Sequence, residues 1–409
     1  MTGPARRPAG LPTTLDHFIG DGRVASVDGE TFEVADPVSN QPYATVAAGA
    51  AKDAAKDVDR AVAAAQAAFT EGPWPGLAAR ARARARILNQ IADGIEARAG
   101  RIAELETFET GLPVTQARGQ AARAAENFRF FADMAVTQHE DAFASGTQFG
   151  YVIRSPAGVA GLITPWNTPF MLETWKLAPA LASGCTVVLK PAEWTPLSAS
   201  LLPEIMAEAG LPDGAFNLVH GIGEVAGAAL VAHPGVPRIS FTGETGTGQM
   251  IMAAAAPHRK GLSMELGGKS PCLIFADADL DQAVDSALFG VFSLNGERCT
   301  AGSRILAERP IYDALVTRLA ARAERIKVGD PSDPATEIGA LVHPEHYARV
   351  LSYVQAGRDE GARLGGRPNQ PGRAGPRQLP RRLHLDPGPS PGPPGGTRGR
   401  VRHDLDQLA

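Results

Sequence analysis

Residues 263–302 decide the fold, and they read SMELGGKSPCLIFADADLDQAVDSALFGVFSLNGERCTAG. The stretch holds a carboxylate, Glu265, near its start and Cys299 near its end, with small residues and Arg298 around the cysteine. A nucleophilic cysteine needs a thiolate, an uncrowded approach and a base for the second half of its reaction. The stretch therefore predicts an active site built on Cys299.

Upstream of this stretch, strand-like and helix-length segments alternate. Five short apolar runs, VAGLI, TVVLK, FNLV, RISFT and LSMEL, are each separated by enough residues for a helix. This alternation predicts an α/β fold with a mostly parallel, doubly wound sheet. Ligands bind such sheets beyond the carboxyl ends of the strands, where residues 164–167, 190–193, 242–248 and Glu265 fall.

The flanking segments are also predicted to be ordered. Residues 1–50 show short strands and turns, and helices are expected over 52–69, from about 77, over 101–110 and over 117–136. Phe149, Tyr151 and Ile153 alternate as in a hairpin strand. Residues 271–365 form a second α/β segment, in which SPCLIF and SRILA read as strands and 279–294, 310–326 and 344–361 as helices. The acidic DADLD indicates a helix N-cap followed by a favourable first turn.

Composition excludes several classes of protein. The chain has 409 residues, 44% hydrophobic and 21% charged, which is enough for two or three domains. Its net charge of −4 gives no reason to expect a nucleic-acid or membrane partner. Its cysteines are Cys185, Cys272 and Cys299, a sparse count without paired spacing that indicates a reducing, cytoplasmic location and no metal site. Cys185 and Cys272 are expected to be inert residues on buried strands.

The motifs MELGGKSP and FSLNGERCTAGSR, with FTGETGTG ahead of them, resemble the aldehyde dehydrogenase superfamily over about residues 15–365. The resemblance implies an NAD-binding domain from residues 1–140 and 158–265, an oligomerisation hairpin over 141–157 and a catalytic domain over 266–365. It also implies a homodimer or homotetramer. An ordinary edge hairpin is the alternative for 141–157.

The resemblance implies a catalytic role for three residues. Cys299 would attack the aldehyde, and the Asn167 amide with the Cys299 backbone N–H would hold the oxyanion. Glu265 would act as general base, activating water to release the acid. The alternatives are a turn role for Asn167 and a solvated strand-end carboxylate for Glu265. The CoA-acylating enzymes that resemble this family lack that glutamate.

NAD is the cofactor that the resemblance implies. FTGETGTG has the spacing G-x-T-x-x-G, with a helix N-terminus behind it that suits a pyrophosphate, although such turns also occur without ligands. Glu193 would bind the adenosine ribose and disfavour the 2′-phosphate of NADP. Glu244 stands where many relatives have serine and adds negative charge. The expected cofactor residues are Thr164, Pro165, Trp166, Lys190, Ala192, Glu193, Gly223, Phe241, Thr242, Gly243, Glu244, Gly248 and Leu266.

The substrate site is expected around the helix after Asn167. Its residues would be Thr168, Met171, Leu172, Trp175 and Arg298, although an apolar helix face is by default core. Arg298 suits an anionic aldehyde, and a surface salt bridge is the alternative. Within the family, these motifs look most like those of enzymes that oxidise semialdehydes in the breakdown of aromatic compounds. This resemblance implies 5-carboxymethyl-2-hydroxymuconate semialdehyde as substrate, with another semialdehyde or an aliphatic aldehyde as the alternative.

Residues 366–409 are rich in proline, glycine and arginine, and the resemblance stops before them. Such a segment has too little apolar surface to offset its ordering entropy, so disorder is expected. In the family this region carries further strands and an EIFGP-like motif whose glutamate holds the nicotinamide ribose. The composition indicates a shifted reading frame, with a genuine variant as the alternative. It predicts poor oligomerisation and little activity, so a catalytically impaired fragment is the alternative function.

Overall fold

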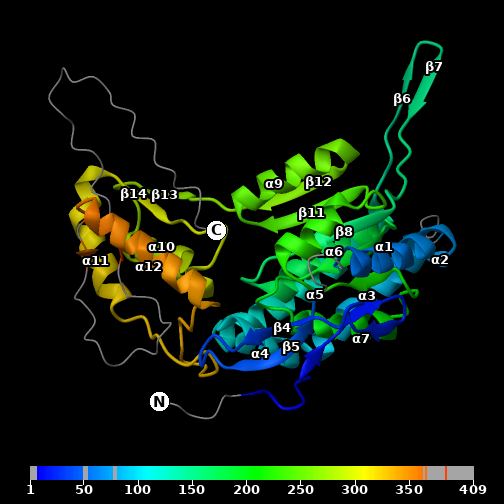
Figure 1. Cartoon of the computed structure of the whole chain (residues 1–409). Helices are drawn as coiled ribbons and strands as arrows, with labels where there is room; N and C mark the ends of the chain where they lie inside the picture. Colours follow the sequence, from blue (N-terminus) through cyan, green and yellow to red (C-terminus); the bar gives the residue numbers. More distant parts are fainter. Residues whose placement is uncertain (1–6, 49–53, 77–80, 363, 366–382, 385–409) are drawn as a thin grey trace.

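The computed structural model describes residues 7–48, 54–76, 81–362, 364–365 and 383–384 (Figure 1). A seven-stranded sheet lies at its centre, in the order β12-β11-β8-β9-β10-β2-β3. Its strands are β2 (His17–Ile19), β3 (Gly22–Val24), β8 (Val159–Ile163), β9 (Thr186–Lys190), β10 (Phe216–Leu218), β11 (Arg238–Gly243) and β12 (Gly261–Leu266). β8 to β12 are the five predicted strands and run parallel, whereas β2 and β3 extend the sheet antiparallel.

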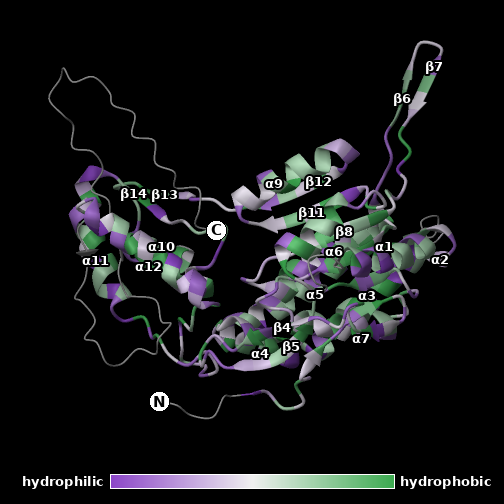
Figure 2. Ribbon diagram, in the orientation of Figure 1, coloured by the Kyte–Doolittle hydropathy of each residue, from purple (hydrophilic) through white to green (hydrophobic). Residues whose placement is uncertain are grey.

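Helices cover both faces of this sheet, which confirms the doubly wound fold. Alternate residues of β8 face opposite layers: Ala160 and Leu162 pack in one core, Val159 and Ile163 in the other. The first core includes side chains of α3 (Ala81–Ala97), α5 (Val114–Thr137), α6 (Pro169–Ala182) and α7 (Leu202–Glu208). The second includes side chains of α1 (Ala54–Thr70), α8 (Ala228–Ala232) and α9 (Thr245–Ala255). In Figure 2 β8 is mainly green, as a strand buried on both faces should be.

The predicted helices and strands after residue 270 form a second group (Figure 1). β13 (Pro271–Ile274) pairs in parallel with β14 (Arg304–Ala307). Helices α10 (Leu280–Phe292) and α11 (Tyr312–Ala323) share an apolar core with these strands, and α12 (Pro344–Asp359) follows. Asp279 is the N-cap of α10, because its carboxylate accepts the N–H groups of Asp281 and Gln282 at 3.0 and 3.1 Å. The predicted cap is therefore confirmed.

The remaining elements frame the sheet. β1 (Thr14–Leu15), β4 (Thr31–Ala35) and β5 (Pro42–Ala47) make a small separate sheet. Along the chain, α2 (Pro73–Gly76) follows α1 and α4 (Ala99–Thr110) follows α3. β6 (Ala142–Ser145) and β7 (Gln148–Tyr151) form a hairpin that projects from the molecule (Figure 1). Its strand ends at Tyr151, two residues earlier than the predicted alternation, although Ile153 is as exposed as the hairpin aromatics.

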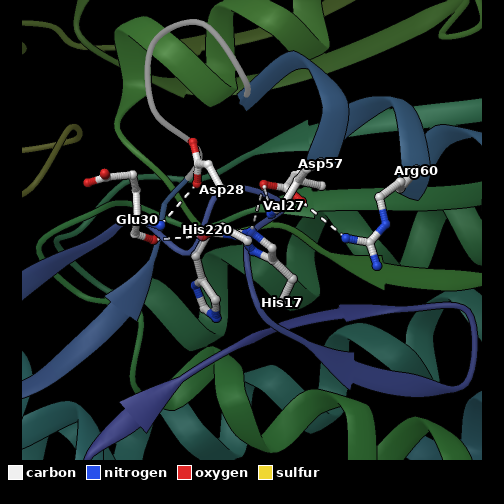
Figure 3. Close-up of polar contacts among 8 residues, drawn as sticks. His17, Val27, Asp28, Glu30, Asp57, Arg60 and His220 are labelled. Atoms are coloured by element: carbon white, nitrogen blue, oxygen red, sulfur yellow. Dashed lines mark hydrogen bonds and ion pairs between the residues drawn. The ribbon is translucent and has the colours of Figure 1, made fainter.

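Buried histidines tie the antiparallel edge of the sheet to α1 (Figure 3). The His17 Nδ1 accepts the backbone N–H of His220 at 3.1 Å, and its Nε2 lies 3.5 Å from the Asp57 carboxylate. The two imidazole rings stack with centroids 6.2 Å apart. Burial, with the positive charge around His17, Lys190 and Arg23, lowers the pKa of His220 to about 3. This imidazole is therefore neutral at pH 7.

Two expectations about the cysteines are wrong in detail. Cys185 is buried, but it directly precedes β9 rather than lying on it. Cys272 lies on β13 and is partly exposed, and among the described residues β13 pairs only with β14. The expectation for residues 366–409 falls outside the described residues, apart from Leu383–His384, which form β16 paired antiparallel to β15 (Leu364–Gly365).

Candidate active site

The segment before Cys299 has an unusual backbone. Leu294 and Asn295 adopt positive φ angles of 55° and 58°, a left-handed conformation that costs non-glycine residues free energy. The backbone N–H of Leu294 donates to the Gln116 Oε1 at 2.6 Å. The tight turn ends at Gly296, and Cys299 follows it exposed to solvent. The predicted accessible thiol is present.

The Asn295 side chain explains how this strained turn is held. Its buried amide donates to the carbonyl oxygens of Gly111 and Ala340, at 3.0 and 2.8 Å, and its Oδ1 accepts the N–H of Gly339 at 2.8 Å. All its bonds go to backbone groups of two other segments. Asn295 therefore fixes the nucleophile turn against the end of α4 and the segment that leads into α12.

The loop after β8 brings Asn167 to the nucleophile turn. The Asn167 Nδ2 donates to the backbone carbonyl of Glu297 at 2.7 Å, two residues before Cys299. The amide nitrogen has two hydrogens, and this bond uses one of them. The Asn167 Oδ1 accepts the N–H of Thr168, which orients the amide. Asn167 and the Cys299 segment are thus placed together, as the predicted oxyanion site requires.

Glu297 is a buried acid that sequence reasoning did not find. Its Oε1 accepts the N–H of Val342 at 3.2 Å and lies 3.5 Å from the Nε2 of His346 on α12. Burial raises the pKa of Glu297 well above its usual range, and burial with nearby Arg349 and His343 lowers the pKa of His346 to about 4. The His346 imidazole is therefore neutral at pH 7, and the contact is not a charged pair.

Glu265 lies on β12, one residue before its end, and is exposed to solvent. The chain continues through Gly268, where an added Cβ would lie 3.8 Å from the carbonyl oxygen of Cys299. The glycine turn after Glu265 therefore passes against the nucleophile segment.

Lys176 on α6 is a buried lysine. Burial lowers its pKa to about 8, an effect partly opposed by the Glu265 charge. The Lys176 Nζ donates to the Ser240 Oγ at 2.9 Å.

Lys190 and Glu193 form an ion pair at the end of β9. The Lys190 Nζ lies 2.9 Å from the Glu193 Oε2, and the lysine side chain is 3% exposed against 32% for the glutamate. Burial would raise the pKa of Glu193, but the charge and hydrogen bond of Lys190, with a backbone hydrogen bond, outweigh it and lower the pKa. Glu193 therefore presents an ionised, accessible carboxylate. Gly223 lies beside it, since an added Cβ would be 4.0 Å from the same Oε2.

The glycine-rich turn leads from β11 into α9, as predicted. A Cβ at Gly248 would lie 2.6 Å from the Leu266 side chain, so a larger residue there would force that side chain to shift. A Cβ at Gly246 would meet nothing within 4 Å, so the first turn of α9 is open. Glu244 is the N-cap of α9, yet its carboxylate makes no capping bond and accepts one from the Arg349 Nη2 at 2.9 Å.

The other expected cofactor residues lie in two environments. Trp166 is partly exposed, with its ring 5.8 Å from Trp194 and 4.8 Å from His346. Thr164, Ala192, Phe241 and Thr242 are buried, while Pro165, Gly243 and Leu266 are partly exposed. These residues gather at the carboxyl ends of β8, β9, β11 and β12, the edge where ligands of doubly wound sheets bind.

The structure separates the expected substrate residues. Thr168, Met171 and Leu172 are buried, and the last two belong to the main core. Trp175 is 48% exposed and remains available to a ligand. The Arg298 guanidinium donates to the hydroxyls of Ser293 and Thr300 and lies 5.6 Å from the Phe289 ring centre. Among the residues that the structure describes, Arg298 contacts hydroxyls and a ring and forms no salt bridge, unlike the alternative expected for it.

Sequence reasoning missed Lys176, Glu297, His346 and Arg349. A lysine within the apolar run PFMLETWKLAPALA was a usable signal, because a buried cation needs a functional or structural reason. No comparable signal marks His346 or Arg349, which reach the site only through the placement of α12. Among the residues that the structure describes, no cluster of His, Cys, Asp or Glu could hold a metal, and no helix could cross a membrane.

Comparison with known proteins identifies the family. A family model described as the aldehyde dehydrogenase family matches residues 24–376. The chain belongs to the aldehyde dehydrogenase family. It is 45% identical over 368 residues to 2-hydroxymuconic semialdehyde dehydrogenase of Pseudomonas sp. (strain CF600), and 44% identical over 360 residues to 5-carboxymethyl-2-hydroxymuconate semialdehyde dehydrogenase of Escherichia coli. Each match covers 87% of this chain and 74% of the relative.

Solved structures show the same fold. HpcC from Thermus thermophilus is 49% identical with a TM-score of 0.84, covering 91% of this chain and 71% of that one. An aldehyde dehydrogenase from Bacillus cereus in an NAD+ complex is 36% identical with a TM-score of 0.83, covering 93% and 75%. The predicted family, α/β fold and enzyme class are therefore confirmed.

Proposed function

We propose that this aldehyde dehydrogenase oxidises a carboxylated semialdehyde through a thioester on Cys299. The observation that carries the proposal is the Asn167–Glu297 bond, which brings the amide of the loop after β8 to the exposed cysteine. In this proposal, residues 1–140 and 158–265 form the NAD-binding domain and residues 266–365 the catalytic domain.

NAD is the cofactor, as predicted, since a solved relative in this family holds NAD+. The residues present fit it. Glu193 offers an ionised carboxylate beside Gly223 for ribose hydroxyls, and the open first turn of α9 offers backbone N–H groups for the pyrophosphate. When bound, NAD accepts a hydride.

The proposed steps use this chain's own groups. The Cys299 thiolate adds to the aldehyde carbon, and the oxygen, now negative, accepts hydrogen bonds from the Asn167 amide and the Cys299 N–H. Loss of hydride from that carbon leaves a thioester. Glu265 takes a proton from water, and the resulting hydroxide attacks the thioester carbon and expels the Cys299 thiolate. The product is the carboxylic acid.

The proposed substrate is 5-carboxymethyl-2-hydroxymuconate semialdehyde, with another semialdehyde as the second choice. The support is two relatives at 45% and 44% identity, both of them semialdehyde dehydrogenases. Arg298 adds a cation next to the nucleophile, held by hydroxyls rather than by a carboxylate. A substrate carboxylate would therefore not have to displace a protein carboxylate from it.

The hairpin β6–β7 is proposed to contact a second copy of the chain, in a homodimer or homotetramer. Phe143, Phe149 and Tyr151 are 65%, 69% and 62% exposed on an element that projects away from the core. Exposed apolar side chains in such number mark an interaction surface. A cytoplasmic location is proposed from the three free cysteines.

The decisive experiment measures NADH formation by the purified full chain with a panel of carboxylated and neutral aldehydes. The proposal expects higher kcat/KM for the carboxylated compounds. Arg298→Met should raise KM for these more than for a neutral aldehyde of the same length, with Arg325→Met, at an exposed position after α11, as the matched control. Equal effects on both substrates would remove Arg298 from recognition. NADH binding without NADH formation would favour the impaired fragment instead.

A further inference from the structure

The first half of α12 lies on the ligand edge of the central sheet. The His346 ring is 4.8 Å from that of Trp166, after β8, and the His343 ring stacks on Trp194, after β9, at 4.4 Å and 8°. The third contact, from Arg349, reaches Glu244 after β11. One helix of the second group thus contacts the loops that follow three parallel strands.

The Arg349 contact determines where the Glu244 carboxylate points. Glu244 occupies the N-cap position of α9 with an extended backbone, φ −67° and ψ 144°. Its Oε1 is 2.9 Å from the Arg349 Nη2, and both side chains are about one-third exposed, at 30% and 37%. The carboxylate makes no bond to the first N–H groups of α9. The guanidinium therefore holds the acid to one side of the helix end.

A Glu244 carboxylate without this partner would be free to turn toward the end of α9. The N-terminus of a helix attracts anions through its free N–H groups and dipole, so Glu244 would be drawn onto the first turn of α9. That turn is open, since a Cβ on Gly246 would meet nothing within 4 Å. In the proposed function, on which this inference rests, the pyrophosphate of NAD binds there. A carboxylate in that place would occupy the N–H groups and repel the phosphates.

We propose that Arg349 is a positioning residue for the cofactor, and that it acts by holding the Glu244 carboxylate away from the pyrophosphate site. The proposal explains how an acid can stand in the glycine-rich turn of a dinucleotide-binding enzyme. It also makes a specific claim of coupling. Replacing Arg349 should weaken the binding of phosphate-bearing ligands only while Glu244 is present.

The test is a double-mutant cycle on the full chain, read by NADH fluorescence titration and by calorimetry with ADP-ribose. Arg349→Met should raise Kd for both ligands by about tenfold, the size of a lost interaction with a charged group. In the Glu244→Ser background the same substitution should change Kd by less than about threefold, as for an exposed charge. Arg358→Met, an exposed arginine in the last turn of α12, is the matched control and should change neither.

Adenosine binding distinguishes the proposed effect from general structural damage, because damage to the site would weaken adenosine binding as well. Adenosine has no phosphate, so its Kd should be the same in Arg349→Met as in the unmodified chain. The proposal would be overturned if Arg349→Met changed Kd equally in both backgrounds, whether the change is large or absent. An equally large change in both would mean that Arg349 contacts the cofactor directly. A parallel loss of adenosine binding would overturn the proposal as well. Absence of NADH binding by the unmodified chain would instead refute the proposed function itself.

Discussion

The Asn167 side-chain amide donates a hydrogen bond of 2.7 Å to the backbone carbonyl of Glu297, two residues ahead of Cys299. This bond joins the loop after β8 to the nucleophile turn, more than a hundred residues later in the chain. It also leaves the second amide hydrogen for the oxygen that becomes negative during the reaction.

We predict that Asn167→Ala lowers kcat by about 10²–10³-fold, the usual cost of losing one oxyanion donor. Asn167→Asp should lower it at least as much, because a carboxylate cannot donate and repels the oxyanion. Stopped-flow measurement of NADH formation gives the rate. Because either substitution also removes the bond to Glu297, NADH binding and the melting temperature must be measured alongside. Full activity in Asn167→Ala would contradict the oxyanion role.

Cys299→Ala should abolish both aldehyde oxidation and ester hydrolysis while NADH still binds. Cys299 is the exposed cysteine of the three, whereas Cys185 is buried and Cys272 is partly exposed on β13. Cys272→Ala is the matched control and should keep its turnover. Alkylation by iodoacetamide followed by mass spectrometry should label Cys299 first. Unchanged turnover in Cys299→Ala would remove this thiol from the mechanism.

Glu265→Gln should separate the two halves of the reaction. Without a general base at this position the thioester forms but water attacks it slowly, so NADH appears as a burst of about one equivalent followed by a slow phase. Rapid-quench or stopped-flow kinetics would detect the burst. If the variant instead shows no burst, while its thioester is hydrolysed at the normal rate, Glu265 acts in the first half of the reaction.

Cofactor choice should depend on Glu193. Its carboxylate is ionised, one-third exposed and beside Gly223. Hydrogen bonds from ribose hydroxyls to a charged group contribute about 1.5–3 kcal/mol each, and a 2′-phosphate would meet repulsion instead. We therefore predict a higher kcat/KM with NAD than with NADP, and a smaller ratio in Glu193→Gln. A preference of the unmodified chain for NADP would contradict this assignment.

The sequence predicted the elements whose signals are local. VAGLI, TVVLK and RISFT are apolar runs between helix-length segments, and they became neighbouring parallel strands. The Asp279 cap was equally readable, because the carboxylate bonds to N–H groups only two and three residues on. The pattern FTGETGTG gave the turn into α9 for the same reason.

Contacts between distant segments could not be read in this way. Met171 and Leu172 have the same apolar character as Trp175, and only the packing of α5 on α6 shows that the first two are core. Glu297 resembles any polar loop residue until Val342 and His346 enclose it. The partner of Glu244 is likewise set by α12, which begins a hundred residues later.

The buried His220 should make the fold sensitive to acid. Its folded-state pKa is about 3, below the ordinary value of 6.5 from which it is lowered by burial and by the charges of His17, Lys190 and Arg23. The unfolded chain therefore binds a proton that the folded chain does not. The stability from this group is complete above about pH 6.5 and is lost as the pH falls toward 3, at about 1.4 kcal/mol per pH unit.

His220→Phe keeps a ring against His17 and removes the titration, so its free energy of unfolding should fall less steeply between about pH 6 and pH 4. The difference in slope from the unmodified chain should approach about 1.4 kcal/mol per pH unit. Urea unfolding followed by fluorescence at each pH measures it. His139→Phe, at an exposed position, is the control and should leave the slope unchanged. Equal slopes for His220→Phe and the unmodified chain would mean that the buried imidazole accepts a proton without cost.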